Sequence, residues 1–191
     1  MTLLVLGLLL FLGTHSIRIF ADGWRTAQIA RLGAGPWKGL YALASLAGFV
    51  LIVYGFGLAR AAPVVLWTPP VWTRHVTALL MMIAFILLTA AYVRGNHLNA
   101  AIGHPMLAAT KIWALAHLLA NGNVAHVVLF GAFLAWSIVA FASSRRRDRA
   151  AGTKYPAPGA GRDLLTVVIG LVAWGLFAHY GHLWLIGVKP L

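Results

Sequence analysis

The sequence contains no cysteine and no glutamate, and only three of its 191 residues are acidic: Asp22, Asp148 and Asp163. The absence of cysteine excludes disulfides, thiolate catalysis, zinc–thiolate sites and haem attached through thioether bonds. The three aspartates all lie between long apolar segments, so those segments provide no carboxylate. Charged residues of either sign make up only 9% of the chain, whereas hydrophobic residues make up 61%. This composition is far from that of a soluble domain and predicts a membrane protein.

Six apolar segments are long enough, or nearly long enough, for the roughly 20 residues that a helix needs to cross the bilayer core. They are Leu3–Phe20, Gly39–Leu58, Val76–Val93, Pro105–Ala120, Val124–Ala142 and Leu164–Val188. No basic segment precedes the first of them, which favours a retained span over a cleaved signal peptide. We therefore predict an all-α, polytopic transmembrane helix bundle with about six spans, built as a single domain over residues 1–191.

The formal net charge of +12 would suggest nucleic-acid binding in a soluble chain, but here the basic residues lie between the apolar segments. This pattern is typical of the positive-inside distribution and predicts no nucleic-acid partner. The basic loops are the first, third and fifth, which places them in the cytoplasm and both termini in the periplasm of a bacterial inner membrane. Segment 143–163 is predicted to be a solvated, basic cytoplasmic connector. The residues that set this orientation are Arg18, Arg25, Arg31, Lys38, Arg94, Arg145, Arg146, Arg147, Arg149, Lys154 and Arg162.

His15 and His117 are predicted to lie deep in the bilayer, where an ionisable side chain is costly and indicates a functional site. His15 lies 12 residues past Leu3, and His117 lies 12 residues past Pro105. At about 1.5 Å of rise per residue, each lies ~18 Å from the edge of a ~30 Å core, counted from opposite edges. Their levels then differ by only ~6 Å, so the pair suits a flat macrocycle with one imidazole on each face. The alternative is that each histidine only hydrogen-bonds to a neighbouring helix.

The other histidines are predicted nearer the membrane surfaces, where amphipathic side chains commonly lie. They are His97 and His104 at the cytoplasmic boundary and His75 and His126 at the outer side. His179 and His182 are three residues apart on one face of the last span, a spacing that permits a metal. This pair is the runner-up for metal ligation.

The segment that runs from His104-Pro105-Met106 through Trp113-Ala114-Leu115-Ala116-His117 to Asn121-Gly122 resembles the signature of NnrU-type membrane proteins. That family is related to the 15-cis-zeta-carotene isomerases of plants and cyanobacteria. The resemblance covers most of the chain and extends more loosely to Thr14-His15-Ser16. It implies a haem b whose two axial ligands are His117 and His15.

The resemblance also has consequences for the surroundings of the haem. Gly103 stands where the family usually has an arginine before His104. If that arginine meets a haem propionate in the family, then either Arg18 or Arg94 replaces it here or the site differs. Trp113 lies on the same helical face as His117 and would flank the macrocycle or pack against neighbouring side chains, with packing favoured.

Iron held by two neutral imidazoles is a low-spin centre suited to electron transfer. The resemblance implies a role in denitrification, with nitric oxide and the nitrite- and nitric-oxide-reducing enzymes as partners. It equally implies a haem-dependent cis–trans isomerisation of a hydrophobic polyene, a reaction that needs no carboxylate. The sequence leaves open which of these roles applies and whether the protein is an enzyme.

Two other classes compete with the haem interpretation. The first is a membrane assembly or accessory factor that binds no cofactor. The second is a membrane methyltransferase, since a His-Pro pair at the cytoplasmic end of a span also resembles that class. The methyltransferase is less well supported, because S-adenosylmethionine favours a nearby carboxylate and the apolar segments have none.

The predicted orientation is testable with fused reporters. A reporter that is active only in the cytoplasm should be active when fused after Arg149 and inactive when fused after Leu191, because basic loops remain on the cytoplasmic side. A reporter active only in the periplasm is the control and should give the opposite pattern. The reverse result for both reporters would contradict the depth argument for His15 and His117, which depends on these span directions.

Overall fold

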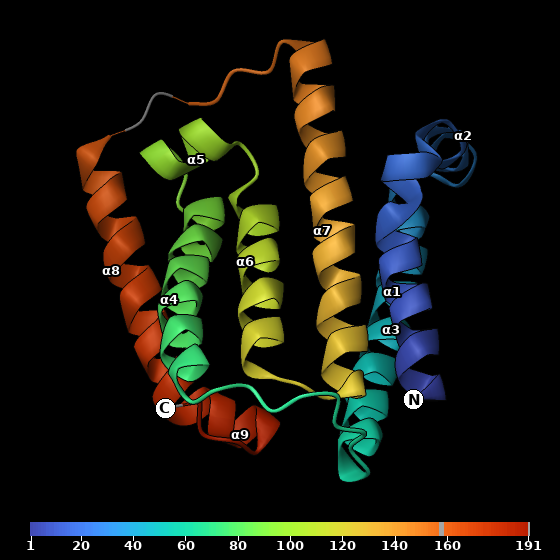
Figure 1. The fold of residues 1–191 in the computed structure, drawn as a ribbon. Helices are drawn as coiled ribbons and strands as arrows, with labels where there is room; N and C mark the ends of the chain where they lie inside the picture. Colours follow the sequence, from blue (N-terminus) through green and yellow to red (C-terminus); the bar gives the residue numbers. More distant parts are fainter. Residues whose placement is uncertain (157–158, 191) are drawn as a thin grey trace. The chain divides into compact units, whose positions relative to one another are not determined.

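Helices account for most of the computed structural model, which describes residues 1–156 and 159–190. Each of the six predicted apolar segments forms a helix, and the described part of the chain contains no strand, only one isolated bridge between Val65 and Asn123. The all-α prediction is therefore confirmed (Figure 1). The elements are α1 Thr2–Phe20, α2 Asp22–Leu32, α3 Ala34–Ala61, α4 Trp72–Tyr92, α5 His97–Ile102, α6 Pro105–Ala120, α7 Val124–Ala151, α8 Ala160–Leu176, the π-helical turn η1 Phe177–Gly181 and α9 His182–Ile186.

The helices have the lengths that membrane crossing requires. Five described helical segments are long and apolar enough to span a bilayer: α1, α3, α4, α7 and the continuous run Ala160–Ile186. The 16-residue helix α6 is apolar but shorter. The chain is thus a multi-pass membrane protein with about six spans, as predicted.

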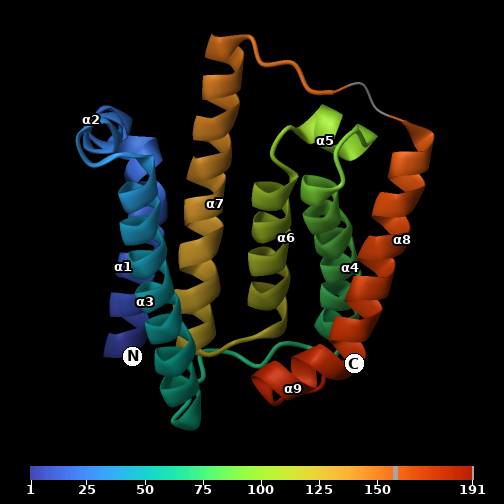
Figure 2. The same ribbon diagram turned by 180° about the vertical axis from the view of Figure 1, so that it is seen from behind.

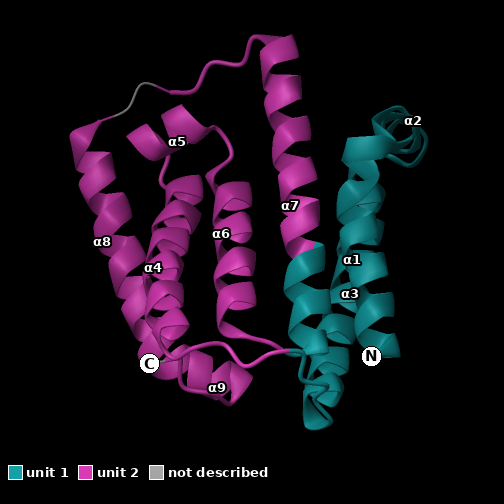
Figure 3. Ribbon diagram, in the orientation of Figure 1, with its two compact units in different colours: residues 1–66, 123–132 teal, residues 67–122, 133–191 magenta. Residues whose placement is uncertain are grey.

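The chain divides into two compact units (Figure 3). Unit 1 consists of residues 1–66 and 123–132, and unit 2 consists of residues 67–122 and 133–191. Helix α7 therefore contributes its first residues to unit 1 and the remainder to unit 2. The prediction of one domain over residues 1–191 stays a prediction.

In unit 1, α1 and α3 lie side by side at glycine contacts (Figure 1). A Cβ atom added to Gly55 would lie 2.4 Å from the backbone nitrogen of Leu4, and one added to Gly48 would lie 2.7 Å from the backbone nitrogen of Phe11. On α1, a Cβ atom added to Gly7 would lie 2.6 Å from the backbone nitrogen of Ile52. Small residues that let two helix backbones touch are the usual device for packing in lipid, where apolar side chains gain little from each other.

In unit 2, α4 packs between α6 and α8 (Figures 1 and 2). Ala84, Leu87 and Ala109 form the buried centre of the contact between α4 and α6. The Thr77 hydroxyl donates across this contact to the carbonyl of Ala116, at 2.8 Å. On the other side, a Cβ at Gly170 of α8 would lie 2.7 Å from the Cα of Ile86. Small residues therefore set the helix spacing in this unit as well.

Two short helices, α2 and α5, fall in the loops that the sequence predicted after the first and third spans. Neither has the apolar run by which spans are recognised. Helix α5 begins at the buried Asn96, whose side chain accepts a hydrogen bond from the backbone of Asn99 at 2.7 Å and donates to the carbonyl of Ala90 at 3.0 Å. This cap joins the end of α4 to the start of α5.

The predicted connector 143–163 is partly helical, because α7 continues through Ala151. Ser143 and Ser144 are buried, and the Arg147 guanidinium donates to their hydroxyls at 2.8 and 2.9 Å. The basic residues at the start of the connector thus extend the helix. Residues 157–158 of the connector lie outside the described residues.

The glycine contact of unit 1 predicts opposite effects for two alanine substitutions in α3. Gly55→Ala should lower the free energy of unfolding by roughly 1–3 kcal/mol, because the new methyl group meets backbone that cannot move aside. Gly57→Ala should leave it unchanged or raise it by up to about 1 kcal/mol, since Gly57 has open space around its Cα and alanine favours the helix. Thermal unfolding in detergent, followed by circular dichroism, measures both. Equal effects at the two positions would contradict the contact.

Candidate functional site

His15 is held by its own helix and by α3 of unit 1. Its Nδ1 hydrogen-bonds to the carbonyl of Phe11 at 2.7 Å, one turn earlier in α1. Its ring lies 4.2 Å from the Phe11 ring and 5.3 Å, edge to face, from the ring of Tyr41 in α3. The imidazole is half-buried, and its orientation is fixed on two sides.

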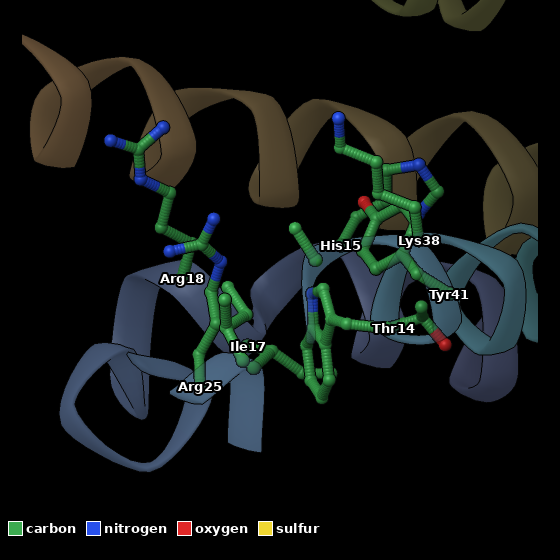
Figure 4. Close-up of a pocket in the computed structure, with 10 residues that line it drawn as sticks. Thr14, His15, Ile17, Arg18, Arg25, Lys38 and Tyr41 are labelled. Carbon is green, nitrogen blue, oxygen red and sulfur yellow. The ribbon is translucent and has the colours of Figure 1, made fainter. Parts of the chain in front are cut away.

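A pocket of about 380 Å³ opens beside His15 (Figure 4). Residues of α1, α2 and α3 line it, and three of them are cations: Arg18, Arg25 and Lys38. Figure 4 shows Arg18 and Arg25 on one side of the pocket and Lys38 and His15 on the other. Positively charged, polar and apolar groups therefore meet in one cavity within unit 1.

His117 lies in unit 2, near the end of α6. Its Nδ1 hydrogen-bonds to the carbonyl of Trp113 at 2.8 Å, again one turn earlier in the same helix. The Asn121 side chain donates to the His117 carbonyl at 2.9 Å and so ends the helix. Gly122 follows because its Cα lies against the backbone of Trp67, where a Cβ would approach the carbonyl oxygen to 1.8 Å. The Asn-Gly pair of the signature thus fixes the helix end next to His117.

The two histidines share one electronic feature. A carbonyl oxygen only accepts hydrogen bonds, so Nδ1 of His15 and of His117 carries the proton. In a neutral imidazole the lone pair then lies on Nε2. Metal-ligating histidines commonly have this arrangement, in which the nitrogen opposite the metal donates to a backbone carbonyl.

Trp113 packs rather than standing open beside His117. Its ring lies 5.4 Å, edge to face, from that of Phe133 and 5.5 Å from the imidazole of His117. It also packs against the buried Ala84–Leu87–Ala109 centre of unit 2. The favoured interpretation of Trp113 as a packing residue agrees with these contacts.

His104 belongs to a polar cluster at the start of α6. Its Nε2 lies 2.7 Å from a carboxylate oxygen of Asp148 in α7, and the Tyr155 hydroxyl donates to that oxygen at 2.5 Å. Burial, and then the hydrogen bond with Asp148, raise the pKa of the Tyr155 hydroxyl above its usual value, so it remains a donor. These bonds tie the C-terminal part of α7 to α6; the predicted cofactor role of His104 stays a prediction.

Gly103, which precedes His104, lies in a backbone conformation and a confined space that disfavour a side chain. The backbone of Gly103 has a φ of +77°, which favours glycine. A Cβ here would lie 2.5 Å from the Tyr155 hydroxyl and 2.7 Å from Nη1 of Arg145. The guanidinium of Arg145 therefore occupies the space next to residue 103 that a side chain at that position would enter.

The remaining predicted residues lie apart from these groups. Arg94 is exposed just after α4, and His97 pairs with Asp163 at 2.5 Å, which ties α5 to the start of α8. His179 lies within the π-helical turn η1, and its Nδ1 bonds to the carbonyl of Gly175. His182 is the first residue of α9, and its Nδ1 bonds to the carbonyl of Val188. Within the described ranges, no group of three or more His, Cys, Asp or Glu side chains is placed to hold a metal ion.

Sequence reasoning missed four residues that shape these sites: Arg25 and Lys38 in the pocket, and Asp148 and Tyr155 around His104. In the sequence, Arg25 and Lys38 stand out only as loop charges that set orientation. Arg25 lies within α2 and Lys38 near the start of α3, and the apolar pattern that reveals the spans does not mark either position. Asp148 lies 44 residues after His104, and no periodicity marks such a contact.

Comparison with known proteins gives one match. A family model described as NnrU protein matches residues 3–190, nearly the whole chain, which confirms the resemblance seen in the sequence. No curated protein and no solved structure matches the chain.

The environment of Gly103 predicts a specific loss of stability. Gly103→Ala should lower the free energy of unfolding by about 2 kcal/mol, because it combines an unfavourable backbone conformation with displacement of the Tyr155 hydroxyl from its hydrogen bond to Asp148. Gly152→Ala is the matched control: φ is +60° there and the space is open, so it should cost only the backbone strain, about 1 kcal/mol. Thermal unfolding in detergent compares the two. An equal loss at both positions would show that the crowding at Gly103 is relieved without cost.

Proposed function

Because the chain belongs to the NnrU family, we propose that it is a protein of the bacterial inner membrane that binds haem b through His15 and His117. One observation carries this proposal: both imidazoles are half-buried in apolar helices and donate Nδ1–H to the carbonyl one turn before. That bond prepares Nε2 to coordinate iron. Bis-histidine ligation also suits a chain without cysteine, in which haem would be held non-covalently.

The residues near His15 also suit the apolar ring and the carboxylates of haem. Haem has an apolar face and two carboxylates at one edge. The pocket beside His15 offers apolar side chains such as Ile17 and Trp37 together with the cations Arg18, Arg25 and Lys38. When bound, haem would supply a one-electron redox centre, and a diatomic molecule would bind only after one of the two histidines leaves the iron.

The proposed role is support of denitrification, at the step of nitrite or nitric oxide reduction and next to the enzymes that catalyse it. His15 and His117 would hold the group at a fixed orientation, because each imidazole is itself held by a hydrogen bond to its own helix. Isomerisation of a hydrophobic polyene is the second role. The observation in its favour is that the apolar segments bear no acid, whereas lipophilic side chains are abundant on them.

The proposed orientation places the basic ends of the helices in the cytoplasm and both termini in the periplasm. In unit 1 the basic residues lie where α1, α2 and α3 meet, as with Arg18 and Lys38. In unit 2, the backbone bond from Gly159 to Gly95 and the His97–Asp163 pair place the start of α8 beside the end of α4. Arg94 and Arg162 therefore lie at the same end of that unit, as the positive-inside distribution requires.

The ligand assignment predicts a distinct spectrum and its loss. Protein purified after haem-sufficient expression should contain extractable haem b, with the sharp visible bands of a six-coordinate, bis-histidine centre after reduction. His15→Ala and His117→Ala should each convert that spectrum and lower haem content by about tenfold or more, because each removes one axial nitrogen. Absorption spectra of the oxidised and reduced protein measure both effects.

The control variants are His75→Ala and His126→Ala, which lie in the first turn of α4 and α7 and should keep the spectrum. His179 donates Nδ1–H one turn back in the same way but is exposed, so His179→Ala tests the runner-up. Loss of the spectrum in His179→Ala or His182→Ala, with His15→Ala unchanged, would move the second ligand to the last span. Wild-type protein without haem would refute the cofactor and leave a cofactor-free assembly or accessory factor as the leading role.

A further inference from the structure

The pocket of unit 1 concentrates positive charge that its own lining residues do not balance. Arg18, Arg25 and Lys38 line it, and no aspartate is among its lining residues. Asp22 pairs with Arg25 at 3.4 Å, but Asp22 is exposed and does not line the pocket. An exposed pair of this kind neutralises little. Three cations around one cavity repel each other until an anion enters, so the cavity favours an anionic group.

The same cavity has an apolar part that is held in place. Ile17, Ile29 and Trp37 contribute to its lining. The Trp37 ring packs edge to face against Trp24 of α2, with centroids 5.7 Å apart, which fixes the indole. A small inorganic anion would leave this surface uncovered. The combination therefore suits a ligand whose anionic head is attached to an apolar body.

The helices that form the pocket indicate its level in the membrane. It is formed where α1 ends, α2 runs and α3 begins, at the polar ends of two helices that are long enough to span a bilayer. An anionic head in this cavity would lie at the level of the lipid headgroups, and its apolar body would extend along the spans. Arginine guanidinium groups bind carboxylates and phosphates through paired N–H donors, while lysine acts as a point charge.

We propose that this pocket binds a carboxylate or phosphate group carried on an apolar body, held by Arg18, Arg25 and Lys38. Two sources share this chemistry. One is the propionate edge of haem, which rests on the proposed function because it requires His15 to ligate the iron. The other is the phosphodiester of an acidic phospholipid, which does not.

The test compares two double variants that lose the same charge. Arg25→Gln with Lys38→Gln removes two cations of the pocket, whereas Arg31→Gln with Arg74→Gln removes two outside it. Circular dichroism in detergent checks that both variants keep the helix content of the wild type. Arg18 is left in place so that the helix end next to His15 is unchanged.

Two probes distinguish the sources. The first is titration of the haem-free protein with haem b and with its dimethyl ester, which has the same iron and ring but no propionate charge. The second is native mass spectrometry with dioleoylphosphatidylglycerol and dioleoylphosphatidylcholine. We expect wild type and the control variant to prefer the anionic member of at least one pair by about tenfold, and the pocket variant to lose that preference.

Loss of the preference for haem b over its ester identifies the propionates, and loss of the preference for phosphatidylglycerol identifies the phospholipid. A pocket variant that behaves like the control variant with both probes overturns the proposal, even if haem binds. If haem binds to none of the proteins, the proposed function fails, and the phospholipid pair alone decides whether the pocket is an anion site.

Discussion

The bilayer core contains no water, and this constraint governs the local structure of every span. A polar side chain on a membrane helix must find its partner within the protein, and the nearest acceptor is the carbonyl one turn before it. The hydroxyls of Thr14, Thr89 and Thr166 make this bond, and so do the imidazoles of His15 and His117. For threonine the bond only satisfies a donor. For histidine the bond also places the proton on Nδ1. The same bond that satisfies the side chain in lipid therefore leaves the lone pair on Nε2, where it suits metal ligation.

Because the chain has few acids, only a few of its basic residues have an aspartate as a partner. Each of the three aspartates of the sequence lies beside a basic partner: Asp22 beside Arg25, Asp148 beside His104 and Asp163 beside His97. Two of these pairs hold short connecting segments of unit 2 against the ends of its long helices. No aspartate is left to line the pocket of unit 1. The same composition therefore leaves an electropositive cavity where α1, α2 and α3 meet.

The sequence predicted the spans well because the length of an apolar run determines whether a helix can cross the bilayer. The predicted Pro105–Ala120 coincides with α6, and the other spans differ from their helices mainly at the ends, as where α7 runs on to Ala151. Contacts between segments were not predictable. Nothing in the order of residues links His104 to Asp148. The positive φ of Gly103 belongs to the C-cap of α5, a six-residue helix too short for an apolar pattern to predict. The depth argument selected His15 and His117, but the bonds that fix their tautomers come from the three-dimensional structure.

In unit 1, the contact that holds α1 and α3 together also positions His15, the proposed iron ligand. The backbone of Phe11 lies so close to Gly48 that no Cβ fits between them, and the Phe11 carbonyl accepts the hydrogen bond from His15. On the opposite helix, Tyr41 lies two turns before Gly48 and 5.3 Å from the His15 ring. The approach at Gly48 therefore sets the distance between His15 and Tyr41, and with it the width of the pocket. A larger residue at position 48 would separate α1 from α3 and widen the cavity at the same time, so the packing of this end of the two helices and the width of the pocket both depend on Gly48.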